Sequence, residues 1–212
     1  MYWWTSDTHF SHGNILKYAN RTIFMNKHEK EVMKNGTVKE QNELRISDET
    51  LERHDEALIR NWNERVKPSD TVYFLGDWCF RNSSGGKQGE GTTTRAEYYL
   101  NQLNGNIVCI KGNHDGNNGL KTILTEGVIY IANKRIRMIH NPQFVNSDYK
   151  LHFTAHVHHH WRFKRIKTMF GFTDCVNVGT DVWNYRPVDI NEIFKHYYRW
   201  KNSLKIEEDF LK

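Results

Sequence analysis

Short apolar runs alternate with amphipathic stretches over the first half of the chain. Residues 2–6, 71–75 and 107–110 are rich in β-branched or aromatic side chains and are typical of buried strands. Between these runs, apolar side chains recur at helical spacing after Ser47 and again over residues 96–103. Strands that alternate with helices require crossover connections, so this half predicts a largely parallel sheet.

The helix predicted after Ser47 has clear signals at both ends. Ser47 can cap it, Asp48 and Glu49 suit its positive end, and Pro68 ends it. Its apolar stripe consists of Leu51, Leu58, Ile59, Trp62 and Val66. A shorter helix is predicted from Gly13, whereas residues 20–46 are polar and predict a surface excursion with one short helix at most.

The second half of the chain changes to short strands joined by tight links. They are predicted over residues 128–132, 135–140, 151–156, 161–168 and 175–178. This spacing predicts a second sheet built as an antiparallel meander. A final helix is predicted over residues 189–201. No internal repeat or linker interrupts the chain, so its 212 residues predict a single α/β domain.

Charge and cysteine content narrow the class of protein. The formal net charge of +5 leans toward anionic partners such as nucleotides or nucleic acid. Cys79, Cys109 and Cys175 are widely spaced, which argues against a disulfide framework and against a thiolate zinc site. No signal sequence and no apolar run of about 18 residues is present, so we expect a soluble cytoplasmic protein without membrane contact.

Polar side chains of metal-ligand type follow the apolar runs. Asp7 and His9 stand at alternate positions after the first run, and on an extended segment both would point the same way. The further candidates after later runs are Asp77, Asn113, His140, His156 and His158. One such residue is more often a cap or a turn, but ligands of open α/β folds bind where parallel strands end. The whole set therefore predicts a metal site.

The same residues resemble, in order, the five motifs of the calcineurin-like metallophosphoesterases. These are Asp7-x-His9, Gly76-Asp77, Gly112-Asn113-His114-Asp115, His140 and His156-x-His158. The resemblance covers residues 6–187, and the opening motif together with residues 177–187 is most similar to a small, compact bacterial and phage branch. It implies a four-layer α/β/β/α sandwich of two mixed β-sheets flanked by helices.

The resemblance also implies a role for each motif residue. Asp7, His9 and His158 would hold one divalent ion, and Asn113, His140 and His156 would hold a second. Asp77 would bridge the two ions, and His114 would face the leaving group. The implied reaction is hydrolysis of phosphomonoesters or phosphodiesters, most simply nucleotide-like ones, by a hydroxide held between the ions. Imidazole, carboxylate and amide ligands suit Mn, Fe, Zn, Co or Ni, of which we favour Mn.

Two positions depart from the family pattern: Phe80, and Ala155, which replaces the usual Gly before His156. Two further residues are candidates for phosphate binding. Phe80 stands where some relatives have a carboxylate that orients the catalytic histidine, so Asp115 is a candidate substitute for that role. Arg81 could contact the substrate phosphate or equally form a surface salt bridge, and His12 is a second candidate. Residues 82–94 predict a loop that serves either as a lid or as an insertion without function.

Two other functions stay open at the level of sequence. Basic and aromatic residues interleave over residues 161–167 and 196–201, which suits a nuclease acting on single strands or ends. The first of these segments fits equally well a charged edge strand that guards against aggregation. A non-catalytic docking module is the other alternative, and the oligomeric state is undetermined.

Overall fold

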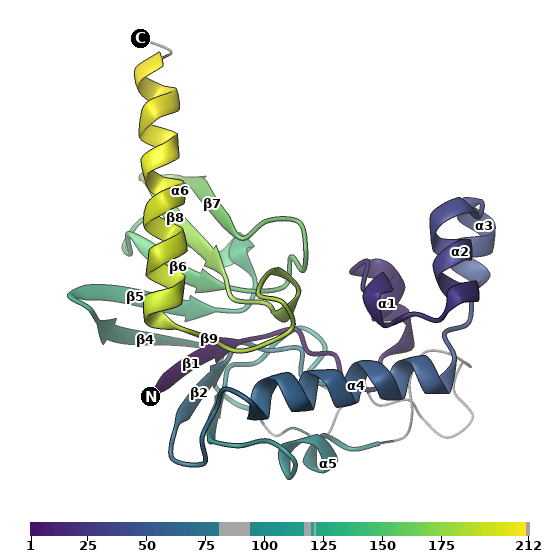
Figure 1. Ribbon diagram of the computed structural model, residues 1–212. Coiled ribbons are helices and arrows are strands. Elements are labelled where there is room, and N and C mark those ends of the chain that lie inside the picture. The colour runs from purple at the N-terminus through teal and green to yellow at the C-terminus, as the bar shows by residue number, and fades with distance from the viewer. Residues whose placement is uncertain (81–93, 117–119, 121, 211–212) are drawn as a thin grey trace.

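Two mixed β-sheets form the centre of the protein, and helices flank them (Figure 1). This computed structural model describes residues 1–80, 94–116, 120 and 122–210. The first sheet has the order β3-β2-β1-β9. Its strands are β1 (Tyr2–Thr5), β2 (Thr71–Phe74), β3 (Asn106–Cys109) and β9 (Val188–Asp189). The first three are parallel, as predicted, and β9 pairs antiparallel with β1.

The second sheet has five strands in the order β4-β5-β6-β8-β7. They are β4 (Glu126–Ile131), β5 (Lys134–Ile139), β6 (Leu151–Thr154), β7 (Phe163–Thr168) and β8 (Gly171–Asn177). The prediction of an antiparallel meander is wrong, because β6 pairs parallel with both β5 and β8. Every residue of β6 is buried, which is typical of a central parallel strand. Short strand lengths and tight links do not specify such pairing.

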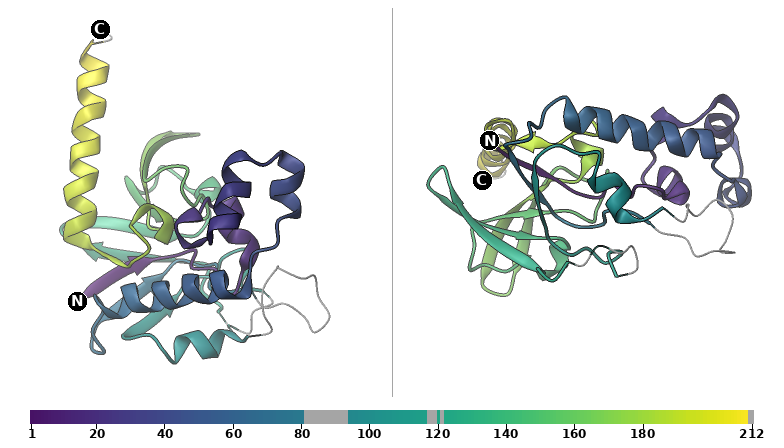
Figure 2. Two further views of the ribbon diagram at one scale, coloured as in Figure 1. Left: turned by 45° about the vertical axis from the view of Figure 1, so that its right-hand side comes forward. Right: turned by 90° about the horizontal axis from the view of Figure 1, so that it is seen from below.

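Helices cover the outer faces of this sandwich. The helices of the sheet-flanking layers are α4 (Asp48–Asn63), α5 (Ala96–Leu100) and α6 (Ile190–Phe210). Ser47 caps α4 as predicted, because its side chain accepts a hydrogen bond from the Thr50 N–H. Figure 2 shows α4 along one face of the first sheet, with the second sheet on the other face. The last helix continues beyond the predicted end at residue 201.

Residues 20–46 contain more structure than their polar composition predicts. They form η1 (Thr22–Phe24), α2 (Lys27–Asn35) and α3 (Val38–Glu43), beside α1 (Gly13–Tyr18). Phe24, Met25 and Ile46 are buried in one apolar cluster, but most of α2 and α3 is exposed. The segment is therefore a surface excursion as predicted, whereas the prediction of one short helix at most is wrong. Polar side chains hold this segment: Glu29 accepts hydrogen bonds from the backbone of Asn26 and Ser47.

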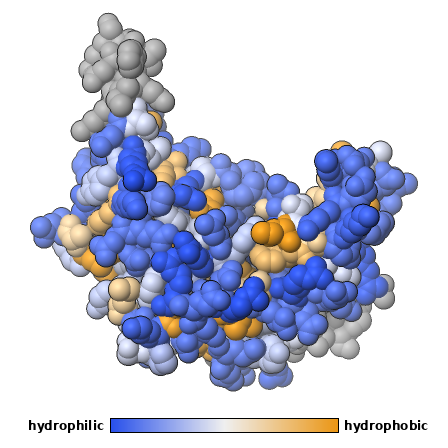
Figure 3. Space-filling view, in the orientation of Figure 1, coloured by the Kyte–Doolittle hydropathy of each residue, from blue (hydrophilic) through white to orange (hydrophobic). Residues whose placement is uncertain are grey.

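Trp3 and Trp4, which are adjacent in β1, pack into different layers of the apolar core. Trp4 packs with Phe153 between the two sheets, whereas Trp3 packs with Leu58 beneath α4. Successive strand side chains point to opposite faces, so one strand serves both layers. No helix within the described residues is long and apolar enough to cross a membrane. The face seen in Figure 3 is mostly hydrophilic, with scattered apolar patches.

Candidate metal centre

The loops after β1, β2 and β6 turn sharply instead of continuing as strands. Asp7 and His9 have φ values of 54° and 48°, and His156 and His158 have φ values of 71° and 47°. The prediction that Asp7 and His9 point the same way because their backbone is extended is therefore wrong. Left-handed backbone, which Asp and His adopt more readily than most residues, turns them toward the centre. The first two loops also pair directly, because Asp7 N donates to Gly76 O at 3.0 Å.

Asp7, His9 and His158 form a first group of candidate ligands. Their ligand atoms all lie within 4.8 Å of one another, and Asp7 and His9 are buried. Both carboxylate oxygens of Asp7 accept from the backbone N–H of His156, at 3.2 and 3.1 Å. Burial raises the pKa of Asp7 to about 6, although the nearby charge of His158 opposes the rise. A carboxylate buried in this way is stabilised by a neighbouring cation.

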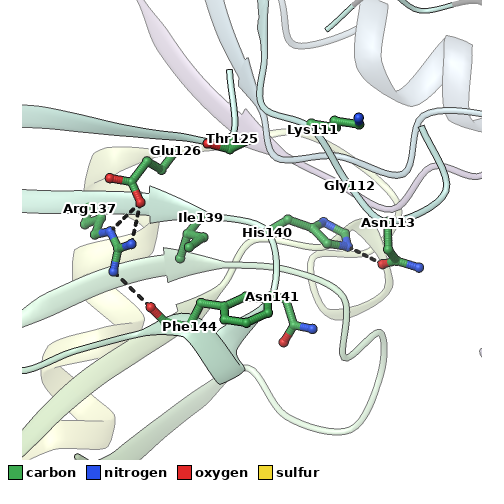
Figure 4. Close-up of a pocket in the computed structure, with 10 residues that line it drawn as sticks. All are labelled: Lys111, Gly112, Asn113, Thr125, Glu126, Arg137, Ile139, His140, Asn141 and Phe144. Carbon is green, nitrogen blue, oxygen red and sulfur yellow. Dashed lines mark hydrogen bonds and ion pairs between the residues drawn. The ribbon is translucent and has the colours of Figure 1, made fainter. Parts of the chain in front are cut away.

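Asp77, His140 and His156 form a second group with the same 4.8 Å spacing. Asp77 lies between the groups, since its Oδ2 is 3.3 Å from His140 Nε2 and 3.5 Å from His9 Nε2. Asn113 Oδ1 lies 2.9 Å from His140 Nε2, as the dashed line in Figure 4 shows. The structure thus brings together all seven residues that the sequence predicted as ligands.

The hydrogen bonds of His140 define which of its nitrogens faces the centre. Its Nδ1 lies 2.6 Å from the carbonyl of Leu75, so this nitrogen carries a hydrogen and donates it. Burial opposes protonation of the ring, but Asp77 and Asp7 outweigh it and raise the pKa of His140 to about 9. The anionic surroundings therefore attract positive charge to this position, which a metal ion can supply in place of a proton.

The buried Nε2 atom of His9 indicates whether these residues fit a metal ion. Among the described residues, His9 Nε2 is buried and has no hydrogen-bond partner. Burial also lowers the pKa of His9 well below its ordinary value, so the ring is a neutral ligand. Buried polar atoms normally have a hydrogen-bond partner. A buried imidazole nitrogen that lacks one and lies beside carboxylates is the arrangement expected of a metal ligand. The donors present therefore fit divalent transition-metal ions.

His114 and Asp115 follow the candidate ligand Asn113. The His114 ring is exposed, with its centroid 5.4 Å from that of His9, and its backbone N–H donates to Asp77 Oδ1 at 2.9 Å. Asp115 accepts hydrogen bonds from the backbone N–H groups of Asp77, Trp78 and Gly112, at 2.8–2.9 Å. Its carboxylate therefore fixes the backbone at Asp77, which differs from the suggested role of orienting the His114 ring.

Phe80, which departs from the family pattern, contacts His12 and not the proposed catalytic His114. Phe80 stacks on the ring of His12, with centroids 4.6 Å apart. His12 is buried, and its Nδ1 lies 3.5 Å from His9 Nδ1. Burial lowers the pKa of His12 to about 3. Its suggested contact with phosphate stays a prediction. Arg81 and residues 82–93 of the predicted loop lie outside the described residues, so their suggested roles stay predictions as well.

The sequence analysis missed two residues that support the first ligand group. Asp181 Oδ2 lies 3.0 Å from His158 Nδ1, and Arg21 forms an ion pair with Asp181. A carboxylate that binds the outer nitrogen of a histidine is a common support for a metal ligand. Asp181 stands in the segment 177–187, whose resemblance to relatives was a usable signal. Arg21 stands in a polar stretch, and nothing in the sequence marks it.

Comparison with known proteins places this geometry in a family context. A sequence model described as calcineurin-like phosphoesterase matches residues 2–209. The uncharacterized protein MJ1445 of Methanocaldococcus jannaschii is 35% identical over 194 residues, which cover 90% of this chain and 87% of that protein. The crystal structure of AQ665 from Aquifex aeolicus, a protein of unknown function, has a TM-score of 0.54 and 22% identity. That alignment covers 92% of this chain and 98% of the other, and it supports the fold alone.

Proposed function

The chain belongs to the calcineurin-like phosphoesterase family, and from this premise we propose that it hydrolyses phosphate esters with two divalent metal ions. The proposal rests on the position of Asp77 between the two ligand groups. Its Oδ2 lies within 3.5 Å of a histidine nitrogen from each group, His9 and His140. A carboxylate with a purely structural role would need only one histidine partner.

We assign the seven residues to two metal sites. Asp7, His9 and His158 would hold one ion, with Asp77 between the two sites. Asn113, His140 and His156 would hold the other. Bound there, the ions would lower the pKa of a shared water and stabilise the attacking and leaving oxygens of an in-line displacement. Among Mn, Fe, Zn, Co and Ni, which this donor set suits, we favour Mn.

His114 is proposed as the catalytic residue. It is exposed beside the first ligand group and is not needed to complete either group. An imidazole in that place can donate a proton to the leaving oxygen or stabilise its charge. The hydrogen bond from its backbone to Asp77 couples its position to the centre.

We propose a small, nucleotide-like phosphate ester as the substrate. A net charge of +5 favours anionic ligands, and two metal ions would strengthen that preference. The free thiols of Cys79, Cys109 and Cys175 support a reducing, cytoplasmic setting. Of the two basic and aromatic segments that would suit a nuclease, the first lies largely in β7, an edge strand with Lys164 and Lys167 exposed. That placement supports the protective role of an edge strand over binding of single strands.

Metal-dependent hydrolysis tests the proposal directly. Purified protein with Mn²⁺ is incubated with 4-nitrophenyl phosphate and, separately, with bis(4-nitrophenyl) phosphate, and nitrophenol release is followed. We expect release that EDTA abolishes and that Asp77→Asn reduces by more than tenfold, whereas Asp148→Asn, at an exposed position, retains full activity. A lack of release with all five metals would favour the docking module. Cleavage of oligonucleotides in preference to both esters would favour the nuclease.

A further inference from the structure

A pocket opens beside the second group of ligands. It has a volume of about 430 Å³, within the range of small-molecule sites, and Asn113 and His140 form one end of it. Figure 4 shows Phe144 and Asn141 along one side and Lys111 on the other. The pocket therefore adjoins the position where the proposed function puts the reacting phosphate.

On one side of the pocket, Phe144 presents an exposed aromatic ring on an anchored turn. The Phe144 side chain is 65% exposed, although aromatic rings of this size are usually buried. Its turn, η2 (Pro142–Phe144), is anchored because Arg137 Nη1 donates to Phe144 O at 3.0 Å. Glu126 in turn pairs with Arg137, whose Nε lies 3.2 Å from Glu126 Oε2. The backbone of this turn is therefore anchored, and an exposed aromatic ring next to the metal centre suits a flat ring.

The polar groups of the pocket favour an anionic partner with hydrogen-bond acceptors. Arg137 and Glu126 neutralise each other, and Lys111 has no ion-pair partner among the described residues, which leaves one surplus positive charge. Asn141 Oδ1 already accepts from Gln143 N at 2.9 Å. Its Nδ2 group is thus the part of the amide that can donate to a ligand.

We propose that this pocket binds the organic group of the ester and selects nucleotides, with the base packed on Phe144 and Lys111 paired to the phosphate. The inference rests on the proposed function, since it takes the phosphate to lie at the metal centre. Asn141 would donate to an acceptor atom on the base. A base is the flat, acceptor-bearing group that these three side chains suit together.

Binding of two matched probes tests the pocket without relying on turnover. AMP and ribose 5-phosphate share sugar and phosphate, and differ in the base. We expect calorimetry on the Mn²⁺-loaded His114→Ala protein, in which hydrolysis of the probes is slowed, to show AMP binding about tenfold more tightly than ribose 5-phosphate. Phe144→Ala should remove that difference and leave ribose 5-phosphate binding unchanged. Phe172→Ala, which changes an exposed ring outside the pocket, should preserve the difference.

The outcomes separate this inference from the proposed function. Equal affinities of the protein with Phe144 intact for the two probes, or a base preference that survives Phe144→Ala, would overturn the pocket assignment even if esters are hydrolysed. Lys111→Gln should weaken binding of both probes by the same factor, and a loss confined to AMP would contradict the phosphate contact. If Mn²⁺ does not bind, the proposed function fails. The same comparison of probes on the metal-free protein then still decides the pocket.

Discussion

Arg21 and Asp181 form a doubly hydrogen-bonded ion pair that is closed to solvent. Arg21 Nε lies 2.7 Å from Asp181 Oδ1 and its Nη2 lies 3.0 Å from Asp181 Oδ2, with side chains 0% and 1% exposed. Arg21 also donates to the backbone carbonyl of Asp7 at 2.6 Å. One buried cation therefore holds the loop after β1 and, through Asp181, the ring of His158. Burial opposes ionisation of Asp181, but Arg21 keeps its pKa below the ordinary value.

Asp181→Asn should weaken metal binding at the first ligand group. The amide keeps the shape but removes the charge that orients His158, and changes to such supporting groups typically reduce metal affinity about 10–100-fold. Calorimetric titration with Mn²⁺ measures the effect. Asp174→Asn is the matched control, since Asp174 is also a buried carboxylate paired with an arginine, the partly exposed Arg165, outside the ligand groups. It should lower stability and leave Mn²⁺ affinity unchanged. Equal affinities in the two variants would contradict the supporting role.

His114→Ala should separate metal binding from turnover. Because His114 is outside both ligand groups, Mn²⁺ should bind with wild-type affinity. Loss of a general acid typically lowers the rate about 10²–10⁴-fold. Phosphate release from AMP, whose alkoxide leaving group needs a proton, and Mn²⁺ calorimetry on one preparation give both quantities, and His160→Ala serves as a surface control. A parallel fall in metal affinity would instead make His114 a ligand.

Gly112→Ala should disrupt the centre through one added methyl group. A Cβ on Gly112 would lie 2.2 Å from Asp77 Oδ1 and 2.4 Å from Asp77 N, so the proposed bridging carboxylate would have to move. We expect a loss of about 1–3 kcal/mol in stability, together with weaker Mn²⁺ binding. Gly116→Ala is matched to it, because a Cβ there meets nothing within 4 Å. Urea denaturation and Mn²⁺ titration of both variants check the prediction, which fails if they behave alike.

The sequence was sufficient to predict the candidate ligands because they follow strand ends. Asp77 and Asn113 come after neighbouring parallel strands, whose carboxyl ends must share an edge. That rule operates on local patterns and requires no knowledge of side-chain geometry. His140 also directly follows a strand, but β5 belongs to the second sheet, so its place beside Asp77 was indicated by the family resemblance and not by this rule.

What the sequence could not supply depends on contacts between distant residues. Arg21 and Asp181 are 160 positions apart, and no local pattern relates them. The left-handed backbone at His9 likewise accompanies pairing between loops, because its N–H donates to the carbonyl of Asp77, although His tolerates this conformation. The parallel pairing of β6 depends on which strands enclose it. Tertiary packing decided each of these features.

His152 should make stability depend on pH, and its hydrogen bonds explain why. Thr173 donates its hydroxyl to Tyr149 O at 2.7 Å, so it accepts from His152 Nδ1 at 3.0 Å. The Nε2 of His152 is buried without a partner among the described residues. Protonation would add an unpaired buried charge, and burial, assisted by the charge of Arg137, lowers the pKa of His152 to about 4.

The sign of the effect follows from the unfolded chain, in which this pKa is about 6.5. Above pH 6.5 the contribution of a neutral His152 is fully present, and it is lost as pH falls toward 4 because only the unfolded state gains the proton. Urea denaturation in EDTA at pH 7, 6, 5 and 4 should show His152→Leu losing about 3 kcal/mol less stability than the wild-type protein over this range. His28→Gln, at an exposed position, should follow the wild-type curve. If His152→Leu also ran parallel to wild type, the imidazole would have to be protonated in the folded protein.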